Sequence, residues 1–341
     1  MAGDRSPAER GAHGGFIALR DQAVRRGILA VGVVLTLTLL AATLCAAGAG
    51  SLWLLDLAVH FHVQYAALAL VGFVLLLAVR APVWALLALA VSVANGMEAA
   101  PALVTHPVSL PRVPGDATSG DPVRLRVVSI NVLYANDDHD GVLDFLRRER
   151  PDAVALMEMN PSWRAAMAPL QKDYPFHYQT IGIGSRGITF WSRLPMREAS
   201  VLPLGVRQEP AIQATLQVQE RQIRVFAVHT TWPMAPNSAA RRNAQLEKLA
   251  DQARAVTLPL VVVGDLNISP FSPHFQRLLK DGGLRSGADG FGWQPTWPSF
   301  MPPAGIQIDH ALVNSRVVVE HFSAGGAVGS DHLPIVADLV L

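Results

Sequence analysis

Only one cysteine, Cys45, occurs in the 341 residues, and charged residues make up 16% of the sequence. A single cysteine excludes a disulfide bond within the chain, so cysteine content does not indicate the redox compartment. Aromatic residues are 7% of the chain, and no long basic stretch is interleaved with them. Since 28 basic side chains stand against 27 acidic ones, the composition does not predict a surface for a polyanion such as DNA.

Apolar residues make up half of the sequence, and they concentrate near its start. Three runs carry no charge, at residues 27–47, about 63–79 and about 81–97, and each has roughly the length of a transmembrane helix. Arg80 and the helix breaker Pro82 separate the last two runs. The alternative is that these two runs form one bent helix in a soluble core. No nearby sequence of a soluble domain could pack against so many apolar residues. We therefore predict three transmembrane helices.

Two other interpretations of the first apolar run are less well supported. A cleaved signal peptide fits poorly, because a long polar leader precedes the run and two more apolar runs follow it. A lipid-modified Cys45 also fits poorly, because Leu44 stands where a small residue is expected. We expect Cys45 to be a small buried apolar residue.

The arginines predict the orientation in the membrane. The loop at 48–62 has neither lysine nor arginine, whereas Arg80 lies between the second and third runs. Five arginines precede the first run: Arg5, Arg10, Arg20, Arg25 and Arg26. The positive-inside rule places the N-terminus in the cytoplasm, and everything after residue 97 outside it, in a periplasm or at an outer cell surface. We expect Asp56, His60 and His62 to be ordinary polar residues of an outer loop.

Four parts follow from these patterns. Residues 1–26 form a basic cytoplasmic segment and 27–97 the membrane region. Residues 98–123, rich in proline and glycine, form an extended linker. Residues 124–341 have the length of a single domain with a full core.

Strand and helix patterns alternate along this last part. Strands are expected at 125–130, 153–157, 188–191, 211–218, 222–228, from 260, at 306–313 and at 333–340, and helices at 140–150, 238–255 and 273–280. Many strands with few, separated helices predict two packed sheets flanked by helices.

The stretch 261–267 is the clearest candidate for chemistry. Three consecutive valines predict a buried strand, and Gly264 ends it just before Asp265 and Asn267. A carboxylate and an amide at the tip of a rigid strand are suited to holding a metal, a water or a phosphate. Taken alone, the same residues also fit a turn or a helix cap.

Other predicted strands have matching residues at or near their ends. The full set is Asn131, Glu158, His229, Asp265, Asn267, Asp309, Asp331 and His332. Carboxylates without a cysteine ligand favour Mg²⁺ or Mn²⁺ over a structural zinc, and histidines with amides suit a phosphate. Individually Glu158 fits a surface charge, His229 a core histidine and Asp309 a turn. Their common position at strand ends favours one site.

The motifs that hold these residues have a recognisable order. They are Ser129-Ile130-Asn131, Met157-Glu158, Val228-His229-Thr230, Gly264-Asp265-Leu266-Asn267, Ile308-Asp309-His310 and Gly329-Ser330-Asp331-His332-Leu333-Pro334. From residue 125 to 341 the sequence resembles the endonuclease/exonuclease/phosphatase (DNase I-like) superfamily. With three membrane helices before the domain, it is similar to the bacterial membrane-bound branch that includes teicoplanin-resistance proteins.

The resemblance implies an α/β fold, a four-layer sandwich of two β-sheets flanked by helices, with the site at one edge. It implies that Glu158 is the principal metal ligand, with Asn131 and Asp331 close to the metal or phosphate. Asp265 would orient or deprotonate water.

The resemblance also implies roles around the phosphate. Asn267 would hold a phosphate oxygen, while His229, and His332 positioned by Asp309, would stabilise the developing charge. One departure is that Val132-Leu133 follows Asn131, so the acidic residue of abasic-site endonucleases is absent. This absence puts a DNA-specific role in doubt.

Two features bear on the substrate. Arg241-Arg242 fits a solvated helix face better than a phosphate clamp, with Arg241 the candidate contact. The loop at 291–301 is rich in aromatic residues, and Trp297 within it fits satellite core packing and an apolar wall beside the site equally well.

We predict a membrane-anchored, divalent-metal-dependent hydrolase of lipid-linked (polyprenyl) phosphate or pyrophosphate that acts outside the cytoplasm. Nucleic acid is a less favoured partner. The alternatives are a membrane-tethered nuclease and an inactive module that binds phospholipid or a partner protein. The sequence does not indicate the oligomeric state.

Overall fold

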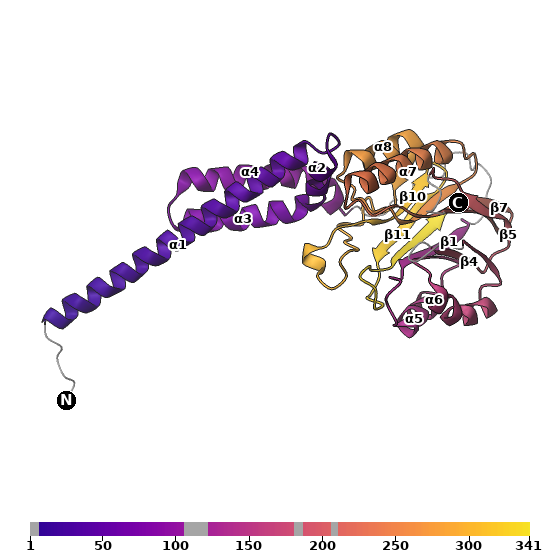
Figure 1. The fold of residues 1–341 in the computed structure, drawn as a ribbon, viewed down its shortest axis with the longest axis horizontal. Coiled ribbons are helices and arrows are strands. Elements are labelled where there is room, and N and C mark those ends of the chain that lie inside the picture. The colour runs from indigo at the N-terminus through magenta and orange to yellow at the C-terminus, as the bar shows by residue number, and fades with distance from the viewer. Residues whose placement is uncertain (1–6, 106–121, 181–186, 206–210) are drawn as a thin grey trace, which may run out of the picture. The chain divides into compact units, whose positions relative to one another are not determined.

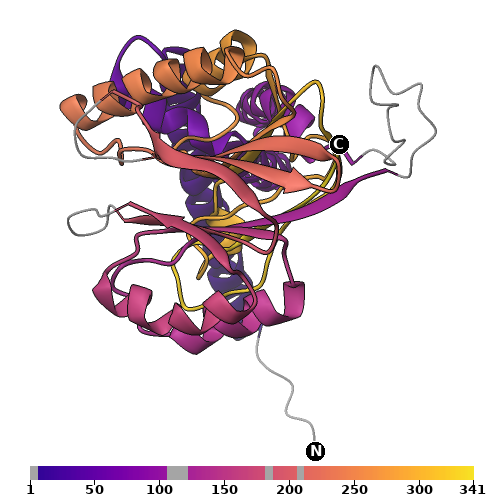
Figure 2. The same ribbon diagram turned by 90° about the vertical axis from the view of Figure 1, so that its right-hand side faces the viewer.

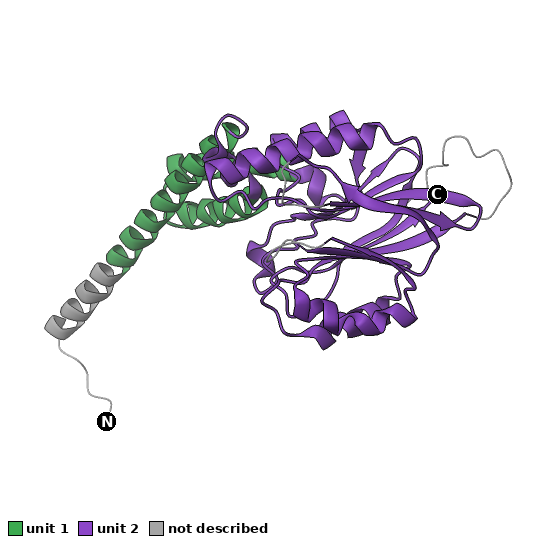
Figure 3. Cartoon of the chain, turned by 45° about the vertical axis from the view of Figure 1, so that its right-hand side comes forward, with its two compact units in different colours: residues 1–48, 61–99 green, residues 49–60, 100–341 purple. Residues whose placement is uncertain are grey.

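The computed structural model describes residues 7–105, 122–180, 187–205 and 211–341. Two compact units divide the chain (Figure 3): residues 1–48 with 61–99, and residues 49–60 with 100–341. Most of the expected linker, residues 106–121, lies outside the described residues, as does Arg5.

The first unit is helical. Its main elements are α1 (Pro7–Ala47), α3 (His62–Ala78) and most of α4 (Pro82–Leu103). Helices long and apolar enough to cross a membrane span Asp21–Ala47, Trp53–Ala78 and Pro82–Leu103. The expectation of three such helices is confirmed.

Two expectations about polar and small residues in this unit are wrong. Cys45 is exposed on α1 rather than buried, so it lies on an outer face of the helix bundle. His62 is not a loop residue but begins α3, and it is buried. Its Nδ1 lies 2.7 Å from Asn95 Oδ1, and Asn95 Nδ2 donates to Thr43 Oγ1 at 2.8 Å. These bonds join the three helices, because a buried polar group needs a partner.

Residues 48–62, which were expected to form a loop, are largely helical. They contain the short helix α2 (Trp53–Ala58) and the turn η1 (Val59–Phe61). Asp56 and His60 are buried within the second unit rather than displayed on an outer loop. The expectation of ordinary outer-loop residues is therefore wrong.

The second unit contains two six-stranded sheets (Figures 1 and 2). One has the strand order β11-β12-β1-β2-β4-β3, and the other has the order β5-β6-β7-β8-β10-β9. The strands of the first sheet are β1 (Arg124–Asn131), β2 (Ala153–Met157), β3 (Phe176–Gln179), β4 (Ile188–Ser192), β11 (Val318–Ala324) and β12 (Ile335–Val340). Those of the second are β5 (Met196–Leu202), β6 (Ala211–Val218), β7 (Arg221–His229), β8 (Leu260–Asp265), β9 (Leu284–Ser286) and β10 (Asp309–Asn314).

Helices cover the outer face of each sheet (Figure 2). On the first sheet these are α5 (His139–Glu149), α6 (Pro161–Ala166) and the turn η2 (Ala168–Lys172). On the second sheet they are α7 (Pro236–Arg254) and α8 (Pro273–Gly282). A further short turn, η4 (Pro302–Ala304), precedes β10. The predicted four-layer sandwich is confirmed.

Alternation along the strands fills the three apolar layers. Val261 and Val263 of β8 join the core between the sheets, whereas Val262 packs under α7 and α8. Side chains of a strand point to opposite faces in turn, so a strand buried on both faces is apolar throughout. The continuous apolar run at 260–263 is thereby explained.

Four strands, β3, β5, β9 and β11, and the helix α6 were not expected. The residues of β3 and β5 have mixed burial, and β9 has only three residues. Such strands give no clear pattern in the sequence. The strand expected at 306–313 begins only at Asp309, since Ile306 pairs instead with Trp297.

Candidate active site

Two pairs of parallel strands bring the predicted residues to one edge of the sandwich. In the first sheet β1 and β2 are parallel, with Asn131 opposite Met157, so Glu158 follows directly. In the second sheet β7 and β8 are parallel, with His229 opposite Asp265. Because β10 is antiparallel to β8, Asp309 enters opposite Asp265 at the start of its strand.

The turn after β8 depends on backbone shapes that few residues tolerate. Gly264 has φ +145°, and a Cβ there would lie 1.8 Å from the Val228 carbonyl oxygen, so only glycine lets β8 lie this close to β7. Asn267 has φ +48°. Its amide N–H donates to Asp265 Oδ1 at 2.9 Å, and its Nδ2 donates to Thr230 O at 2.9 Å. The turn therefore holds both predicted side chains in fixed positions.

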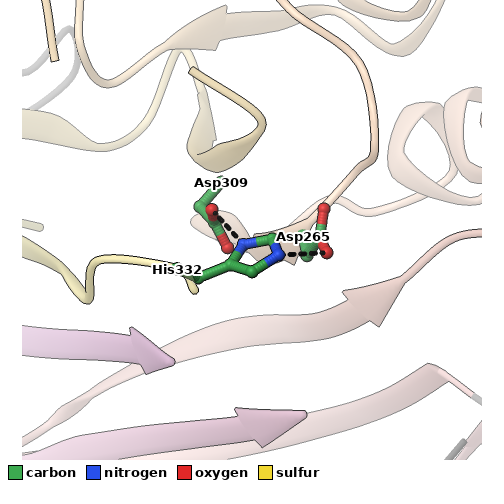
Figure 4. Close-up of side chains that lie close together, drawn as sticks. All are labelled: Asp265, Asp309 and His332. Carbon is green, nitrogen blue, oxygen red and sulfur yellow. Dashed lines mark hydrogen bonds and ion pairs between the residues drawn. The ribbon is translucent and has the colours of Figure 1, made fainter. Parts of the chain in front are cut away.

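Asp265, Asp309 and His332 form a buried cluster (Figure 4). His332 Nδ1 lies 2.9 Å from Asp309 Oδ2, and His332 Nε2 lies 3.8 Å from Asp265 Oδ2. Burial alone would lower the pKa of His332, but the carboxylates of Asp309 and Asp265 outweigh it and raise the pKa to about 10. The imidazole is therefore held protonated, as charge stabilisation requires.

The other side of Asp265 faces Asn131 and His229. Asn131 Nδ2 donates to Asp265 Oδ2 at 3.1 Å, and His229 Nε2 lies 3.5 Å from the same oxygen. Burial raises the pKa of Asp265, with Asp309 adding to the effect and both histidines opposing it. A carboxylate with a raised pKa is a stronger base than an ordinary one.

Glu158 is tied to the same cluster from the first sheet. Its Oε1 accepts from Asn131 Nδ2 at 3.0 Å, and its Oε2 accepts from the backbone N–H of Tyr134 at 3.0 Å. Glu158 has φ +63°, a conformation that non-glycine residues rarely adopt and that recurs at functional sites. Asn131 presents its nitrogen to both carboxylates, while its Oδ1 accepts from Leu133 N at 3.0 Å.

Asp331 is held by the loop that precedes β10. Trp297 Nε1 donates to Asp331 Oδ2 at 3.1 Å, while Asp331 Oδ1 is buried without a hydrogen-bond partner. Trp297 is half-buried. Its indole therefore positions a site carboxylate, a contact that neither interpretation of this loop had anticipated.

The oxygen donors suit a hard divalent cation. Among the described residues, the cluster whose ligand atoms all lie within 4.8 Å of one another is Asp265, Asp309 and His332. This group differs from the predicted ligands Glu158, Asn131 and Asp331. The buried Oδ1 atoms of Asp309 and Asp331 both lack a partner, and such orphaned acceptors need a cation or a water. Four carboxylates without a thiolate fit Mg²⁺ or Mn²⁺.

The structure separates the two arginines on α7. Arg241 is exposed, and its Nε donates to Asn237 O at 3.3 Å. Arg242 is 1% exposed and pairs with Asp56 at 2.6 Å. The expectation that Arg242 belongs to a solvated helix face is wrong, because its partner lies 186 residues earlier in the chain.

Several positioning residues were not anticipated. Thr296 Oγ1 accepts from the N–H groups of Ile308 and Asp309 at 3.1 Å each, and its carbonyl accepts from Leu333 N. Ser330 Oγ donates to Asn131 O at 2.7 Å and accepts from His332 N. Ser330 belongs to the motif Gly329-Ser330-Asp331-His332-Leu333-Pro334, which could have identified it as a site residue. Nothing in the sequence distinguishes Thr296.

Comparisons with known proteins agree with this geometry. A model of the Endonuclease/Exonuclease/phosphatase family matches residues 128–332, more than half of the chain. A search of curated proteins finds no match.

Solved structures share the fold of this domain. A humanised TDP2 from D. rerio has 16% identity and a TM-score of 0.55, covering 64% of this chain and 99% of its own. An endonuclease/exonuclease/phosphatase from Beutenbergia cavernae has 23% identity and a TM-score of 0.53, covering 64% and 72%. NExo from Neisseria, described as a 3′ phosphatase bound to a product DNA hairpin, has 20% identity and a TM-score of 0.52, covering 62% and 98%.

Proposed function

Because the chain belongs to the endonuclease/exonuclease/phosphatase family, whose members are phosphoesterases or nucleases, we propose that it hydrolyses a lipid-linked phosphate or pyrophosphate. The reaction depends on a divalent metal, and the three apolar helices anchor the enzyme in the membrane. A polyprenyl carrier is the substrate class that we favour.

Exposed apolar side chains on segments bonded to the site carry this proposal. Trp232 is 62% exposed and Phe300 77%, and Tyr134, Met234 and Met301 are also exposed. Exposed apolar groups that cluster at a site mark contact with an apolar ligand or a membrane.

Each of these segments is tied to a predicted site residue. The N–H of Tyr134 donates to Glu158. Trp232 follows His229 by three residues, through Thr230, whose N–H donates to the Asp265 carbonyl. The residue before Phe300, Ser299, donates its N–H to Asp331 O and its hydroxyl to Ser330 O. An acyl or prenyl chain attached to a phosphate at the site would meet these side chains.

The side chains divide the work of hydrolysis. Asp265 takes the proton of a water whose oxygen attacks phosphorus, and the bond to the leaving-group oxygen breaks without a covalent enzyme intermediate. Asn267 donates to a phosphate oxygen through its remaining N–H. Protonated His332, held by Asp309, and His229 stabilise the negative charge that develops.

Glu158, Asn131 and Asp331 are the residues we assign to the metal site; the two carboxylates would hold the ion, and Asn131, whose Nδ2 donates to Glu158 Oε1, would orient Glu158 beside it. The bound cation would supply charge neutralisation at the phosphate. A membrane-tethered nuclease is the second candidate, because D. rerio TDP2 with single-stranded DNA product shares the fold at a TM-score of 0.55. The balanced charge of this chain favours the lipid substrate over DNA.

We further propose that the catalytic domain acts outside the cytoplasm, on the basis of the arginines before and between the apolar runs. Protease added to intact spheroplasts is expected to remove the domain at 124–341. Protection of the domain in intact spheroplasts, with cleavage only after lysis, would reverse the orientation.

The substrate class is tested with a long polyprenyl pyrophosphate, water-soluble geranyl pyrophosphate, and DNA in single- and double-stranded form. Mg²⁺-dependent phosphate release from the prenyl substrates without DNA cleavage is expected. For the double variant Trp232→Ala/Phe300→Ala we expect kcat/KM on the long substrate to fall about tenfold or more, since full burial of such a side chain is worth roughly 1.5–3 kcal/mol and a bound prenyl chain would cover each ring only in part. Geranyl pyrophosphate should be turned over nearly as fast as by the wild type.

The matched control is Phe176→Ala. Phe176 is also an exposed aromatic residue, but it pairs with Ser192, which is opposite Ala153 at the far end of β2 from Glu158. This variant should behave as the wild type does on both substrates. DNA cleavage without lipid turnover would refute the lipid proposal, and an equal loss on both prenyl substrates would refute a role for the apolar rim.

A further inference from the structure

Arg242 links Asp56, on the short helix α2, to the turn that carries Asn267. Its NH1 donates to the Asn267 carbonyl oxygen at 2.9 Å, and its NH2 donates to Asp56 Oδ2 at 2.6 Å. Nε donates to Asn243 Oδ1 at 2.7 Å. Every nitrogen of this guanidinium is thereby engaged in a group that solvent hardly reaches.

Asp56 contacts the far end of the same turn. Its Oδ1 accepts from the hydroxyl of Ser272 at 2.6 Å, and Ser272 in turn caps α8 by accepting from His274 N. His60 Nδ1 lies 2.8 Å from Ser269 Oγ. The segment from Asp56 to His60 is thus bonded to the turn at residues 269 and 272 directly, and at 267 through Arg242.

We propose that Asp56 and Arg242 are positioning residues for the phosphate-binding turn at residues 266–272. Asn267 has a left-handed backbone, a conformation that surrounding contacts must stabilise. The bond from Arg242 fixes its carbonyl, while the bonds from its own amide and side chain fix the opposite face. Arg242 holds this orientation because Asp56 neutralises its charge in a buried place.

One consequence is that the catalytic domain is not complete from residue 124 onward. Asp56 lies on α2, at the start of the apolar span Trp53–Ala78, yet it is 2% exposed within the second unit. A residue that precedes the linker in the sequence, but belongs to the second unit, therefore contributes to the geometry of the site.

The test is Asp56→Asn in the full-length, detergent-purified protein. The inference rests on the proposed hydrolysis, and we expect kcat to fall about 10- to 100-fold with KM changed little, since small displacements of a positioning group have effects of this size. The matched control is Asp338→Asn, which breaks a two-bond pair with Arg126 at 2.7 and 2.8 Å, near the start of β1 and away from Asn131. Its kcat should stay near that of the wild type.

Hydrogen exchange measures the order of the turn at 266–272 without relying on enzyme activity. Amides in a peptide covering 266–272 should exchange faster in Asp56→Asn than in the wild type or in Asp338→Asn, while strands β1 and β2 keep their protection. If the wild type hydrolyses none of the phosphoesters, the proposed function fails and the exchange measurement alone decides this inference.

A second variant guards against misfolding. Asp56→Leu/Arg242→Met removes both buried charges together, which leaves no unpaired charge in the core. It should fold and still show the lower kcat and the faster exchange at 266–272. A kcat equal to that of Asp338→Asn, or unchanged exchange at 266–272 in both variants, would overturn the proposal.

Discussion

Replacing Asp265 with asparagine is expected to lower kcat for Mg²⁺-dependent phosphoester hydrolysis by about 10²- to 10⁴-fold, the range that a positioned general base contributes. Asp265 is 1% exposed and accepts hydrogen bonds from Asn131 and from the backbone of Asn267. Asparagine has nearly the same shape, but it cannot take a proton from water. Burial raises the pKa of Asp265, which makes the native carboxylate a better base at neutral pH.

Steady-state kinetics at saturating Mg²⁺ on the prenyl substrate measure this loss. Asp338→Asn is again the control, because it makes the same chemical change in an aspartate that is bonded to Arg126. The thermal unfolding midpoint of Asp265→Asn should not fall below that of this control, since one of several clustered carboxylates has been neutralised. A kcat within tenfold of the wild type would remove Asp265 from the role of base.

The local sequence was sufficient to predict which side chains meet at one edge of the sandwich. Val261, Val262 and Val263 are apolar because β8 is buried on both faces, and Gly264 is needed for a close approach to Val228. Parallel pairing of β7 with β8 then places His229 opposite Asp265. Each of these steps depends on residues near in sequence or on strand pattern, which a single chain reveals.

Contacts between segments far apart in the sequence could not be predicted from local sequence or strand pattern. Arg242 follows another arginine on a helix that is otherwise polar, and its pattern alone indicates a solvated face. Asp56, which neutralises it, lies in a different part of the sequence. Buried ion pairs of this kind leave no periodic trace, because neither partner alternates with apolar residues at a strand or helix period. Trp297 likewise gives no sign that its indole reaches Asp331.

The site draws on both sheets, which links catalysis to the packing of the sandwich. Asn131 and Glu158 come from the first sheet, while His229, Asp265 and Asp309 come from the second. Asn131 Nδ2 bridges Glu158 and Asp265 across the two sheets. A change in how the sheets pack would separate Glu158 from Asp265, which we propose as metal ligand and base, so core substitutions between the sheets are expected to cost activity before they unfold the domain.

Glu158→Gln is the second change with a large expected effect. We expect the Mg²⁺ concentration for half-maximal activity to rise about 10- to 100-fold or more, with a lower maximal rate, since even outer-shell partners of a metal site contribute on this scale. Glutamine keeps an oxygen for the N–H of Tyr134, so the left-handed backbone at Glu158 can persist. What is lost is the negative charge that a hard cation requires.

Thermal unfolding gives a readout of metal binding that is independent of turnover. Mg²⁺ or Mn²⁺ should raise the unfolding midpoint of the wild type, because a ligand that binds only the folded state stabilises it, and should raise that of Glu158→Gln much less. In EDTA the variant should unfold at or somewhat below the wild-type midpoint, because the glutamine amide group replaces one of the two oxygens that accept from Asn131 and Tyr134. If Glu158→Gln and the wild type respond alike to Mg²⁺, Glu158 is not a metal ligand and serves only to orient Asn131.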